Sequence, residues 1–396
     1  MIIDISPSVK WVGKMDYNLR GFHGDQISTH HGSSYNSYLI QDEKTVLVDL
    51  VYAPYATDFI SNLETIIDLN SIDHIVVNHS EPDHSGALPY LMERIPNTPI
   101  ICTASGAKAI KGQYHKDWNF QIVKTGDKIS LGKNELLFID AAMLHWPDTM
   151  MCYLNNENVL FSNDIFGHHF AATSIFDYDS RKSEIMDEAE KYYASIIFPF
   201  ANKAKKKMQQ LDEMNLPLDF ICPAHGVVWK EYIPEILEKY RLWSDAYQLN
   251  QVTIFYDSMY GATIKIAETI AEEMKELEPE LDVKIYHAGK TDSSDIMTNV
   301  FRSKGILVGS SVINNGILNT IAGLLEEICN MGPENKKAAA FGSYGWSPKP
   351  IDMMNEHLGS GGFEIAAAPF KVQWMPNAEM LTKAKEFAKI YLESFK

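Results

Sequence analysis

Short apolar runs separated by polar turns make up most of the chain before residue 250. These runs predict β-strands over residues 45–50, 74–78, 99–103, 135–141, 151–154, 158–162 and 219–223. Apolar residues at helical spacing predict helices over residues 55–69, 184–197, 203–214 and 234–248. Many short strands with few helices indicate a layered sheet structure that carries helices on its outside.

After residue 250 the pattern becomes a regular alternation of strand and helix. Strands are predicted over residues 251–256, 282–287, 305–309, 338–342 and 363–370. Helices are predicted over residues 263–277, 317–328 and 378–395. This alternation predicts a doubly wound parallel sheet of the flavodoxin type. We therefore divide the chain into a first domain, residues 1–249, and a second domain, residues 250–396.

The composition narrows the range of partners and compartments. The 396 residues carry 35 lysines and arginines against 52 aspartates and glutamates, which gives a formal net charge of −17. This balance argues against nucleic acid and against an anionic membrane surface, because both require a basic face. The N-terminus does not resemble a signal peptide and no apolar run approaches the length of a membrane span. We therefore expect a cytoplasmic protein.

The four cysteines do not form a recognisable motif. They are Cys102, Cys152, Cys222 and Cys329, and no two of them make a Cys-x-x-Cys pair. A disulfide framework or an iron–sulfur module within this chain is therefore not expected, and a reducing compartment is favoured.

Residues that can bind metals follow several of the predicted strands. Four of them fall within six residues after strand 74–78; they are His79, Glu81, Asp83 and His84. In a loop, this alternation can direct the first pair to one metal and the second pair to a neighbouring metal. Three more follow later strands; they are His145, Asp164 and His225. Seven ligands suit two metals that share Asp164 and keep open coordination positions.

The composition of this set indicates the kind of metal. A single histidine after a strand is usually structural, and we interpret His74, His115, His287 and His357 in that way. The cluster at residues 79–84 is different, because burying four polar ligands without a metal is costly. Four nitrogen ligands, three carboxylates and no thiolate favour iron or manganese over zinc.

Three loops of the second domain predict a flavin site. Hydroxyls and backbone amides before helix 263–277 can cradle a phosphate. The loop lacks the lysine of a P-loop, and the chain lacks the Gly-x-Gly-x-x-Gly motif of a dinucleotide site. The loops resemble those that bind FMN in flavodoxins, where an aromatic side chain such as Trp346 stacks on the ring. The expected FMN-binding residues are Ser258, Met259, Tyr260, Gly261, Ala262, Thr263, Ser310, Ser311, Val312, Ile313, Asn314, Asn315, Gly316, Ser343, Tyr344, Gly345 and Trp346.

The metal-ligand loop carries a more specific resemblance. It is similar to the His-x-His-x-Asp-His loop of the metallo-β-lactamase fold, with Glu81 in place of the second histidine. With Leu-His-Trp-Pro-Asp around residue 145, Phe-Ser-Asn-Asp up to residue 164 and the flavodoxin-like tail, the whole chain resembles the flavodiiron proteins. The resemblance implies an α/β protein, with a metallo-β-lactamase-like αββα sandwich followed by a flavodoxin-like doubly wound parallel sheet of order 2-1-3-4-5. Two departures concern the flavin loops: Tyr260 replaces a threonine, and Ser-Ser-Val replaces Ser-Pro-Thr at residues 310–312.

The resemblance also implies roles for individual residues. It places His79, Glu81 and His145 on one iron, places Asp83, His84 and His225 on the other, and makes Asp164 the bridge. The residue that matches His84 does not reach the metal in every family member. His23 and Tyr193 match a histidine and a tyrosine that line the substrate pocket.

The implied activity is the reduction of dioxygen to water or of nitric oxide to nitrous oxide, with electrons delivered through FMN. The implied electron donor is rubredoxin or a reduced deazaflavin coenzyme, and the implied assembly is a head-to-tail homodimer or a homotetramer. Two alternatives stand beside this hypothesis. One is a zinc-dependent hydrolase with an accessory flavodoxin domain, and the other is an electron carrier with a degenerate metal domain.

Overall fold

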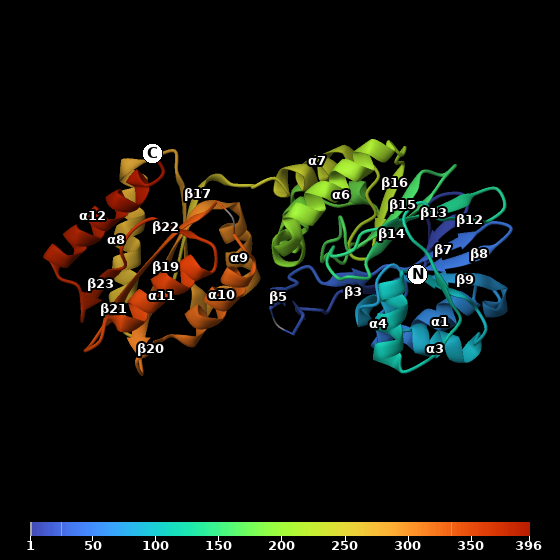
Figure 1. Ribbon diagram of the computed structural model, residues 1–396, viewed down its shortest axis with the longest axis horizontal. Coiled ribbons are helices and arrows are strands. Elements are labelled where there is room, and N and C mark those ends of the chain that lie inside the picture. Colours follow the sequence, from blue (N-terminus) through green and yellow to red (C-terminus); the bar gives the residue numbers. More distant parts are fainter. Residues whose placement is uncertain (1, 25, 334) are drawn as a thin grey trace. The chain divides into compact units, whose positions relative to one another are not determined.

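The computed structural model describes residues 2–24, 26–333 and 335–396, which form two compact units (Figure 1). The first unit contains Met1–Phe22 and Thr29–Asp245. The second contains His23–Ser28 and Ala246–Lys396. The domain boundary that we propose between residues 249 and 250 lies at the start of strand β17 (Leu249–Asp257) in the second unit.

Two stacked sheets form the centre of the first unit. The larger sheet has the order β1-β2-β7-β8-β9-β10-β11, and the smaller has the order β12-β13-β14-β15-β16. The strands of the larger sheet are β1 (Ile3–Asp4), β2 (Val9–Trp11), β7 (Tyr38–Gln41), β8 (Thr45–Val48), β9 (Ile72–Val76), β10 (Ile100–Cys102) and β11 (Phe120–Ile122). Those of the smaller sheet are β12 (Lys128–Ser130), β13 (Glu135–Asp140), β14 (Met150–Leu154), β15 (Val159–Asn163) and β16 (Phe220–Pro223). Among the described residues, three short strands of this unit lie outside both sheets; they are β3 (Lys14–Asp16), β4 (Gly21–Phe22) and β6 (Ser33–Tyr35). Strand β5 (Ile27–Ser28) belongs to the segment that groups with the second unit.

The alternation of side chains along the strands explains the layers. One face of the larger sheet buries Trp11 and Tyr38 against Phe138 and Phe161 of the smaller sheet. The opposite face packs against three helices; they are α1 (Ala56–Glu64), α3 (Leu88–Arg94) and α4 (Ala104–Tyr114). Helices α6 (Ala201–Met214) and α7 (Ile233–Trp243) lie beside the smaller sheet (Figure 1). The expected αββα sandwich is confirmed.

The second unit is built on one parallel sheet of order β18-β17-β19-β21-β22, with β23 also paired to β21. In chain order this is 2-1-3-4-5, as expected. Its other strands are β18 (Asp282–His287), β19 (Ser303–Ile313), β20 (Gly316–Ile317), β21 (Lys337–Tyr344), β22 (Glu364–Ile365) and β23 (Phe370–Gln373). Its helices are α8 (Ala262–Leu277), α9 (Ser293–Arg302), α10 (Asn319–Asn330), α11 (Lys349–Ser360) and α12 (Ala378–Glu393). Helices α8 and α12 pack together over one buried apolar layer.

Several elements differ from the pattern-based prediction. The helix predicted over residues 184–197 consists of α5 (Lys182–Tyr192) followed by one π-helical turn at Tyr193–Ile197. The strand predicted over residues 363–370 is replaced by the separate strands β22 and β23. Among the described residues, no helix has both the length and the apolar character that a bilayer crossing requires.

A candidate dinuclear metal centre and a candidate flavin site

The predicted metal ligands leave neighbouring strand ends of the first unit. His79 and Glu81 lie in the loop after β9. Asp83 and His84, which we expected in the same loop, lie instead in the single-turn helix α2 (Pro82–Ser85). The reason is local, since Pro82 at the first helical position already has a backbone angle suited to a helix start. The turn changes the direction of the chain between the two pairs.

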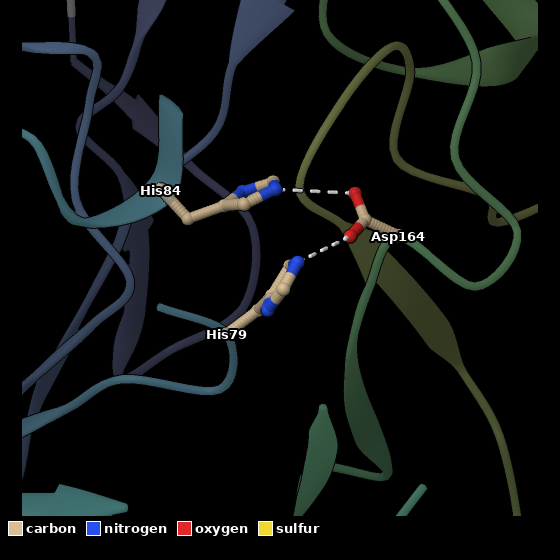
Figure 2. A group of neighbouring side chains, drawn as sticks. All are labelled: His79, His84 and Asp164. Carbon is tan, nitrogen blue, oxygen red and sulfur yellow. Dashed lines mark ion pairs between the residues drawn. The ribbon is translucent and has the colours of Figure 1, made fainter. Parts of the chain in front are cut away.

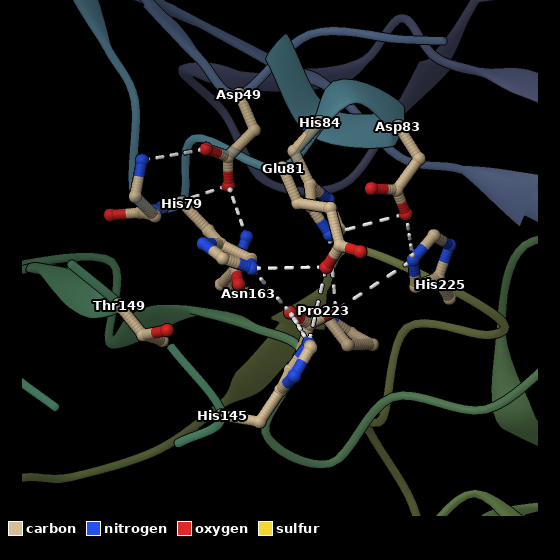
Figure 3. Close-up of polar contacts among 12 residues, drawn as sticks. Asp49, His79, Glu81, Asp83, His84, His145, Thr149, Asn163, Pro223 and His225 are labelled. Carbon is tan, nitrogen blue, oxygen red and sulfur yellow. Dashed lines mark hydrogen bonds and ion pairs between the residues drawn. The ribbon is translucent and has the colours of Figure 1, made fainter. Parts of the chain in front are cut away.

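Two clusters of side chains face each other at this edge (Figure 3). In the first cluster, Oε2 of Glu81 lies 3.2 Å from Nε2 of His79 and 3.2 Å from Nε2 of His145. In the second cluster, Oδ2 of Asp83 lies 3.3 Å from Nε2 of His84 and 3.0 Å from Nε2 of His225. Each cluster therefore presents two imidazole nitrogens and a carboxylate oxygen to one point.

Asp164 lies between the two clusters, and its two carboxylate oxygens turn to opposite sides (Figure 2). Oδ2 is 3.7 Å from Nε2 of His79 and 3.6 Å from Nε2 of His145. Oδ1 is 3.2 Å from Nε2 of His84 and 3.7 Å from Nε2 of His225. The structure thus brings all seven predicted ligands together, in an arrangement in which one carboxylate can contact a metal in each cluster.

Unsatisfied polar atoms support a fit to metal ions. Both carboxylate oxygens of Asp83, Oδ2 of Asp164 and Nε2 of His225 are buried and form no hydrogen bond within the described residues. Buried polar atoms are normally paired, so a group of them that converges is expected to have a partner of another kind. Imidazole and carboxylate ligands without thiolate suit non-haem iron. The residues present therefore fit a pair of such ions.

Hydrogen bonds on the far sides of two rings favour metal binding through Nε2. Nδ1 of His225 lies 2.6 Å from the carbonyl oxygen of Ser34, so it must carry the hydrogen and donate. Nδ1 of His79 lies 3.2 Å from Oδ2 of Asp148, and the backbone N–H of Ser80 donates to the same oxygen at 2.7 Å. In both rings the Nε2 lone pair is left facing the cluster.

The electrostatics of the cluster reflect the close approach of these groups. Burial by itself lowers the pKa of His79, but its hydrogen bonds to the carboxylates of Asp148 and Glu81 raise it to about 9. Burial opposes ionisation of Asp164, yet the neighbouring histidines, His84 foremost, hold its pKa well below the ordinary value. Groups of opposite sign thus lie close together in this cluster, and metal ions bound there would compete with protons for the imidazole nitrogens.

Asp148 belongs to the motif around residue 145, but its role was not part of the sequence prediction. We expect Asp148→Asn to weaken iron binding about 10- to 100-fold, because the ring of His79 loses its charged hydrogen-bond partner. Competition with a chelator measures the effect. The matched control is Asp212→Asn. Asp212 is an exposed carboxylate that pairs with Arg241, and its replacement should leave iron affinity as in wild type. Equal affinity in both variants would contradict the assigned role.

Asp49 is a second buried carboxylate that supports the ligand loop. It is 3% exposed, and it accepts hydrogen bonds from the backbone N–H of Asn78 at 2.7 Å and from the side chain of Asn78 at 3.0 Å. The side chain of Asn163 donates to it at 3.4 Å. Burial raises the pKa of Asp49, with opposition from His84 and Asn78. It links the residues that precede His79 and Asp164, and sequence reasoning missed it.

Tyr193 and His23, which we expect to line the substrate pocket, have different surroundings in the structure. Tyr193 packs edge-to-face on Tyr240, at a ring separation of 5.1 Å, and on Trp243. Its neighbour Tyr192 instead donates a hydrogen bond to Oδ1 of Asp164 at 2.7 Å. His23 is exposed and lies in the segment that groups with the second unit.

We expect Tyr192→Phe to lower the free energy of unfolding by about 1–3 kcal/mol, because a buried carboxylate loses its hydroxyl donor. It should also slow gas reduction more than Tyr193→Phe, which leaves that hydrogen bond in place. Denaturant unfolding and initial rates measure the two effects. If Tyr193→Phe lowers the rate of gas reduction and Tyr192→Phe does not, Tyr193 has the pocket role that the sequence resemblance implies.

A cavity of about 410 Å³ lies at the carboxyl ends of β17, β19 and β21 in the second unit. Its volume falls in the range of ordinary cofactor sites. The expected FMN residues that line it are Met259, Tyr260, Ala262, Ser311, Val312, Ile313, Asn314, Ser343, Tyr344, Gly345 and Trp346. Trp374 and Met375, which follow β23 and were not predicted, complete the lining.

The hydroxyl groups beneath this cavity form a connected cluster. Oγ1 of Thr263 lies 3.0 Å from Oγ of Ser311 and 3.0 Å from Oγ of Ser343. Oγ of Ser258 accepts a hydrogen bond from the N–H of Gly261, whose φ of +86° suits glycine. These groups surround the N-terminus of α8, which favours a phosphate. Ser258, Gly261 and Thr263 lie in this loop but are not part of the cavity lining. Three further expected residues lie outside both; Ser310 accepts a hydrogen bond from the N–H of Leu318, and Asn315 and Gly316 line another cavity.

Fold and sites together define a two-domain protein that joins a dinuclear metal centre of the metallo-β-lactamase type to a flavodoxin-like flavin site. The family model described as ODP family beta lactamase matches residues 34–226, and the flavodoxin model matches residues 254–387. The anaerobic nitric oxide reductase flavorubredoxin of Vibrio vulnificus is 46% identical over 388 residues, which cover 98% of this chain and 78% of the relative.

Solved structures agree with the sequence comparisons. The rubredoxin oxygen:oxidoreductase of Desulfovibrio gigas superposes with a TM-score of 0.96 at 36% sequence identity. The match covers 100% of this chain and 99% of the Desulfovibrio gigas chain. The flavodiiron protein of Giardia intestinalis has a TM-score of 0.92 at 27% identity, with 100% and 97% coverage. The chain belongs to the flavodiiron protein family. It is an oxidoreductase with FMN and a non-haem di-iron site.

Proposed function

We propose that the seven clustered side chains hold two irons at which dioxygen, nitric oxide or both are reduced with electrons that arrive through FMN. The observation that carries this proposal is the position of Asp164 between two similar ligand clusters. When bound, FMN and two irons supply four electrons, enough to reduce one dioxygen to two waters, and two of these suffice to couple two nitric oxides to nitrous oxide and water.

The residues of the chain have separate tasks in this proposal. Asp164 keeps the two metal positions adjacent, so that both atoms of a small substrate are held together. Asp148 and Ser34 fix the orientation of His79 and His225. The hydroxyl of Tyr192, beside Asp164, is the nearest described donor that can stabilise charge on that carboxylate. His84 lies 2% exposed among the other ligands, which supports its assignment to the second iron.

The zinc hydrolase is the weaker alternative. Glu81 stands where the metallo-β-lactamase motif has a histidine, and the cluster contains no thiolate. The relative from Desulfovibrio gigas is named an oxygen oxidoreductase and the one from Vibrio vulnificus a nitric oxide reductase. These names support a redox role and both gases.

We propose a rubredoxin-type electron donor, with a reduced deazaflavin coenzyme as the second candidate, and a head-to-tail homodimer or homotetramer. Exposed aromatic side chains at the flavin cavity support a covering partner: Tyr260 is 86% exposed, Trp346 79% and Trp374 63%. Cytoplasmic location is proposed because Cys102, Cys152, Cys222 and Cys329 are free. Sedimentation of the holoprotein tests the assembly, and a single-chain species at micromolar concentration would contradict it.

The function is tested by reducing the holoprotein without oxygen and mixing it rapidly with each gas in separate experiments. We expect flavin reoxidation by at least one gas to be faster than that of the same protein without iron by about 100-fold or more. A large difference between the gases identifies the preferred substrate. If neither gas reoxidises the iron-loaded protein faster than the iron-free protein, the proposal fails.

A further inference from the structure

A lysine-lined pocket lies on the first unit, separate from the metal cluster and from the flavin cavity. It has a volume of about 320 Å³. Helix α6 forms one wall with Lys203, Lys206, Lys207 and Gln210. The end of β13 and the segment after it form the opposite wall, to which Asp140 contributes. No step of the proposed gas reduction uses this pocket.

The spacing of the lysines explains why they meet in one place. Residues 203, 206, 207 and 210 stand at i, i+3, i+4 and i+7, which form a single face of a helix. The opposite face of α6 is buried through Ala204 and Met208. The helix is therefore held with its cationic face directed at the end of β13. This concentration of positive charge is unusual in a chain whose net charge is −17.

The pocket does not neutralise its own charge. Lys203 and Lys206 have no ion-pair partner among the residues that the structure describes, whereas Lys205 on the same helix lies 2.6 Å from Oδ1 of Asp245. Lys207 donates to the carbonyl oxygen of Asp140 and, at 2.6 Å, to Oε1 of Gln210. Those acceptors are neutral, so three ammonium groups face the one carboxylate of the described lining.

Charge repulsion along α6, the pKa of Lys207 and the hydroxyl of Thr125 all favour a bound anion. Like charges at i, i+3 and i, i+4 destabilise a helix unless a counter-charge separates them. Burial lowers the pKa of Lys207, with the nearby Asp140 in opposition, which is the behaviour of an ammonium group that lacks a full counter-charge. The pocket also offers a hydroxyl donor, because Oγ1 of Thr125 accepts from the N–H of Asp140 at 2.9 Å and keeps its hydrogen available.

We propose that this pocket binds a phosphate-class oxyanion, with Lys203 and Lys206 as its charged ligands and Thr125 as a hydroxyl ligand. Several donors around a concave site suit the oxygens of a compact dianion. A long polyanion is disfavoured, because the strongly negative net charge of the chain repels it beyond the pocket. The pocket volume admits inorganic phosphate or the phosphate group of a small ester.

The test is calorimetric titration of the FMN- and iron-loaded protein with inorganic phosphate at constant ionic strength, with chloride as the background anion. A parallel titration with glycerol 3-phosphate separates free phosphate from a phosphate ester. The test variant is Lys203→Gln with Lys206→Gln. The matched control, Lys205→Gln with Lys239→Gln, removes the same charge from the first unit outside the pocket.

We expect saturable binding of at least one of the two ligands, weakened about tenfold or more in the test variant and unchanged in the control. If phosphate binds at the irons instead, its affinity for both variants equals that for the wild-type protein, and this result overturns the proposal. Equal weakening in both variants would assign the effect to overall charge and also overturns it. Absence of saturable binding to the wild-type protein has the same consequence. Thermal midpoints of the variants without phosphate show whether each one is folded.

Discussion

Asp164→Asn is expected to lower the rate of gas reduction at least 100-fold and to reduce iron content below two ions per chain. The substitution keeps the shape of the side chain but replaces one carboxylate oxygen with an amide nitrogen, which cannot coordinate a metal. Since each oxygen of Asp164 faces a different ligand cluster, one cluster loses its shared ligand. Elemental analysis and initial rates under anaerobic handling measure both effects.

The control for this variant uses the separation of the two sites. FMN content should remain as in wild type, because the flavin cavity is lined entirely by residues of the second unit. Asp219→Asn, at a surface carboxylate that accepts from Asn158, provides a matched loss of charge and should keep full activity. An Asp164→Asn protein that retains both irons and a normal rate would show that Asp164 is not a bridging ligand.

Removal of FMN is expected to lower donor-driven gas reduction by about 100-fold or more while the iron content stays unchanged. The flavin cavity and the metal cluster belong to different units, so loss of one cofactor should not empty the other site. The measurement is gas consumption with a rubredoxin-type donor before and after FMN removal. Re-addition of FMN should restore the rate.

Either of two results would contradict this prediction. If the FMN-free protein consumes gas at the wild-type rate with the same donor, electrons do not travel through the flavin. If removal of FMN also removes the metals, the two sites are not independent. Far-ultraviolet circular dichroism of the FMN-free protein shows whether the second unit is still folded.

Much of the metal cluster could be predicted from the sequence because its ligands follow strand ends. Parallel pairing of β8, β9 and β10, and of β15 with β16, brings the carboxyl ends of these strands to common edges. Side chains just beyond those ends, such as His79 and Asp164, therefore converge even though they are far apart in the chain. Residue types that bind metals then identify them without knowledge of the side-chain geometry.

The supporting residues could not be predicted in the same way. Whether Tyr192 or Tyr193 faces Asp164 depends on the rotation of α5, since adjacent helical residues point about 100° apart. That rotation is set by tertiary packing, including the contact of Tyr193 with Tyr240. Asp49 follows a strand without a local motif, and Asp148 ends the motif around residue 145 without an indication of its partner, so only their hydrogen bonds show their roles.

Some elements of the second unit were also not predicted from the sequence. Helix α9 has no counterpart in the prediction, although its apolar residues Ile296, Met297, Val300 and Phe301 stand at helical spacing; the buried Ser294, Thr298 and Asn299 add no apolar signal. Trp374 was missed as part of the flavin cavity because it follows a four-residue strand and adopts a φ of +63°, a conformation that the sequence does not indicate for tryptophan. The phosphate-cradle loop was easier to predict, since its hydroxyl and glycine residues directly precede a long helix.

Metal analysis of the protein purified without chelators and without oxygen tests the central claim most directly. The proposed centre predicts two irons per chain, lost together when Glu81 and Asp164 are both replaced by alanine. A single ion per chain, or two zinc ions in a protein that hydrolyses esters and leaves both gases unreduced, would contradict it.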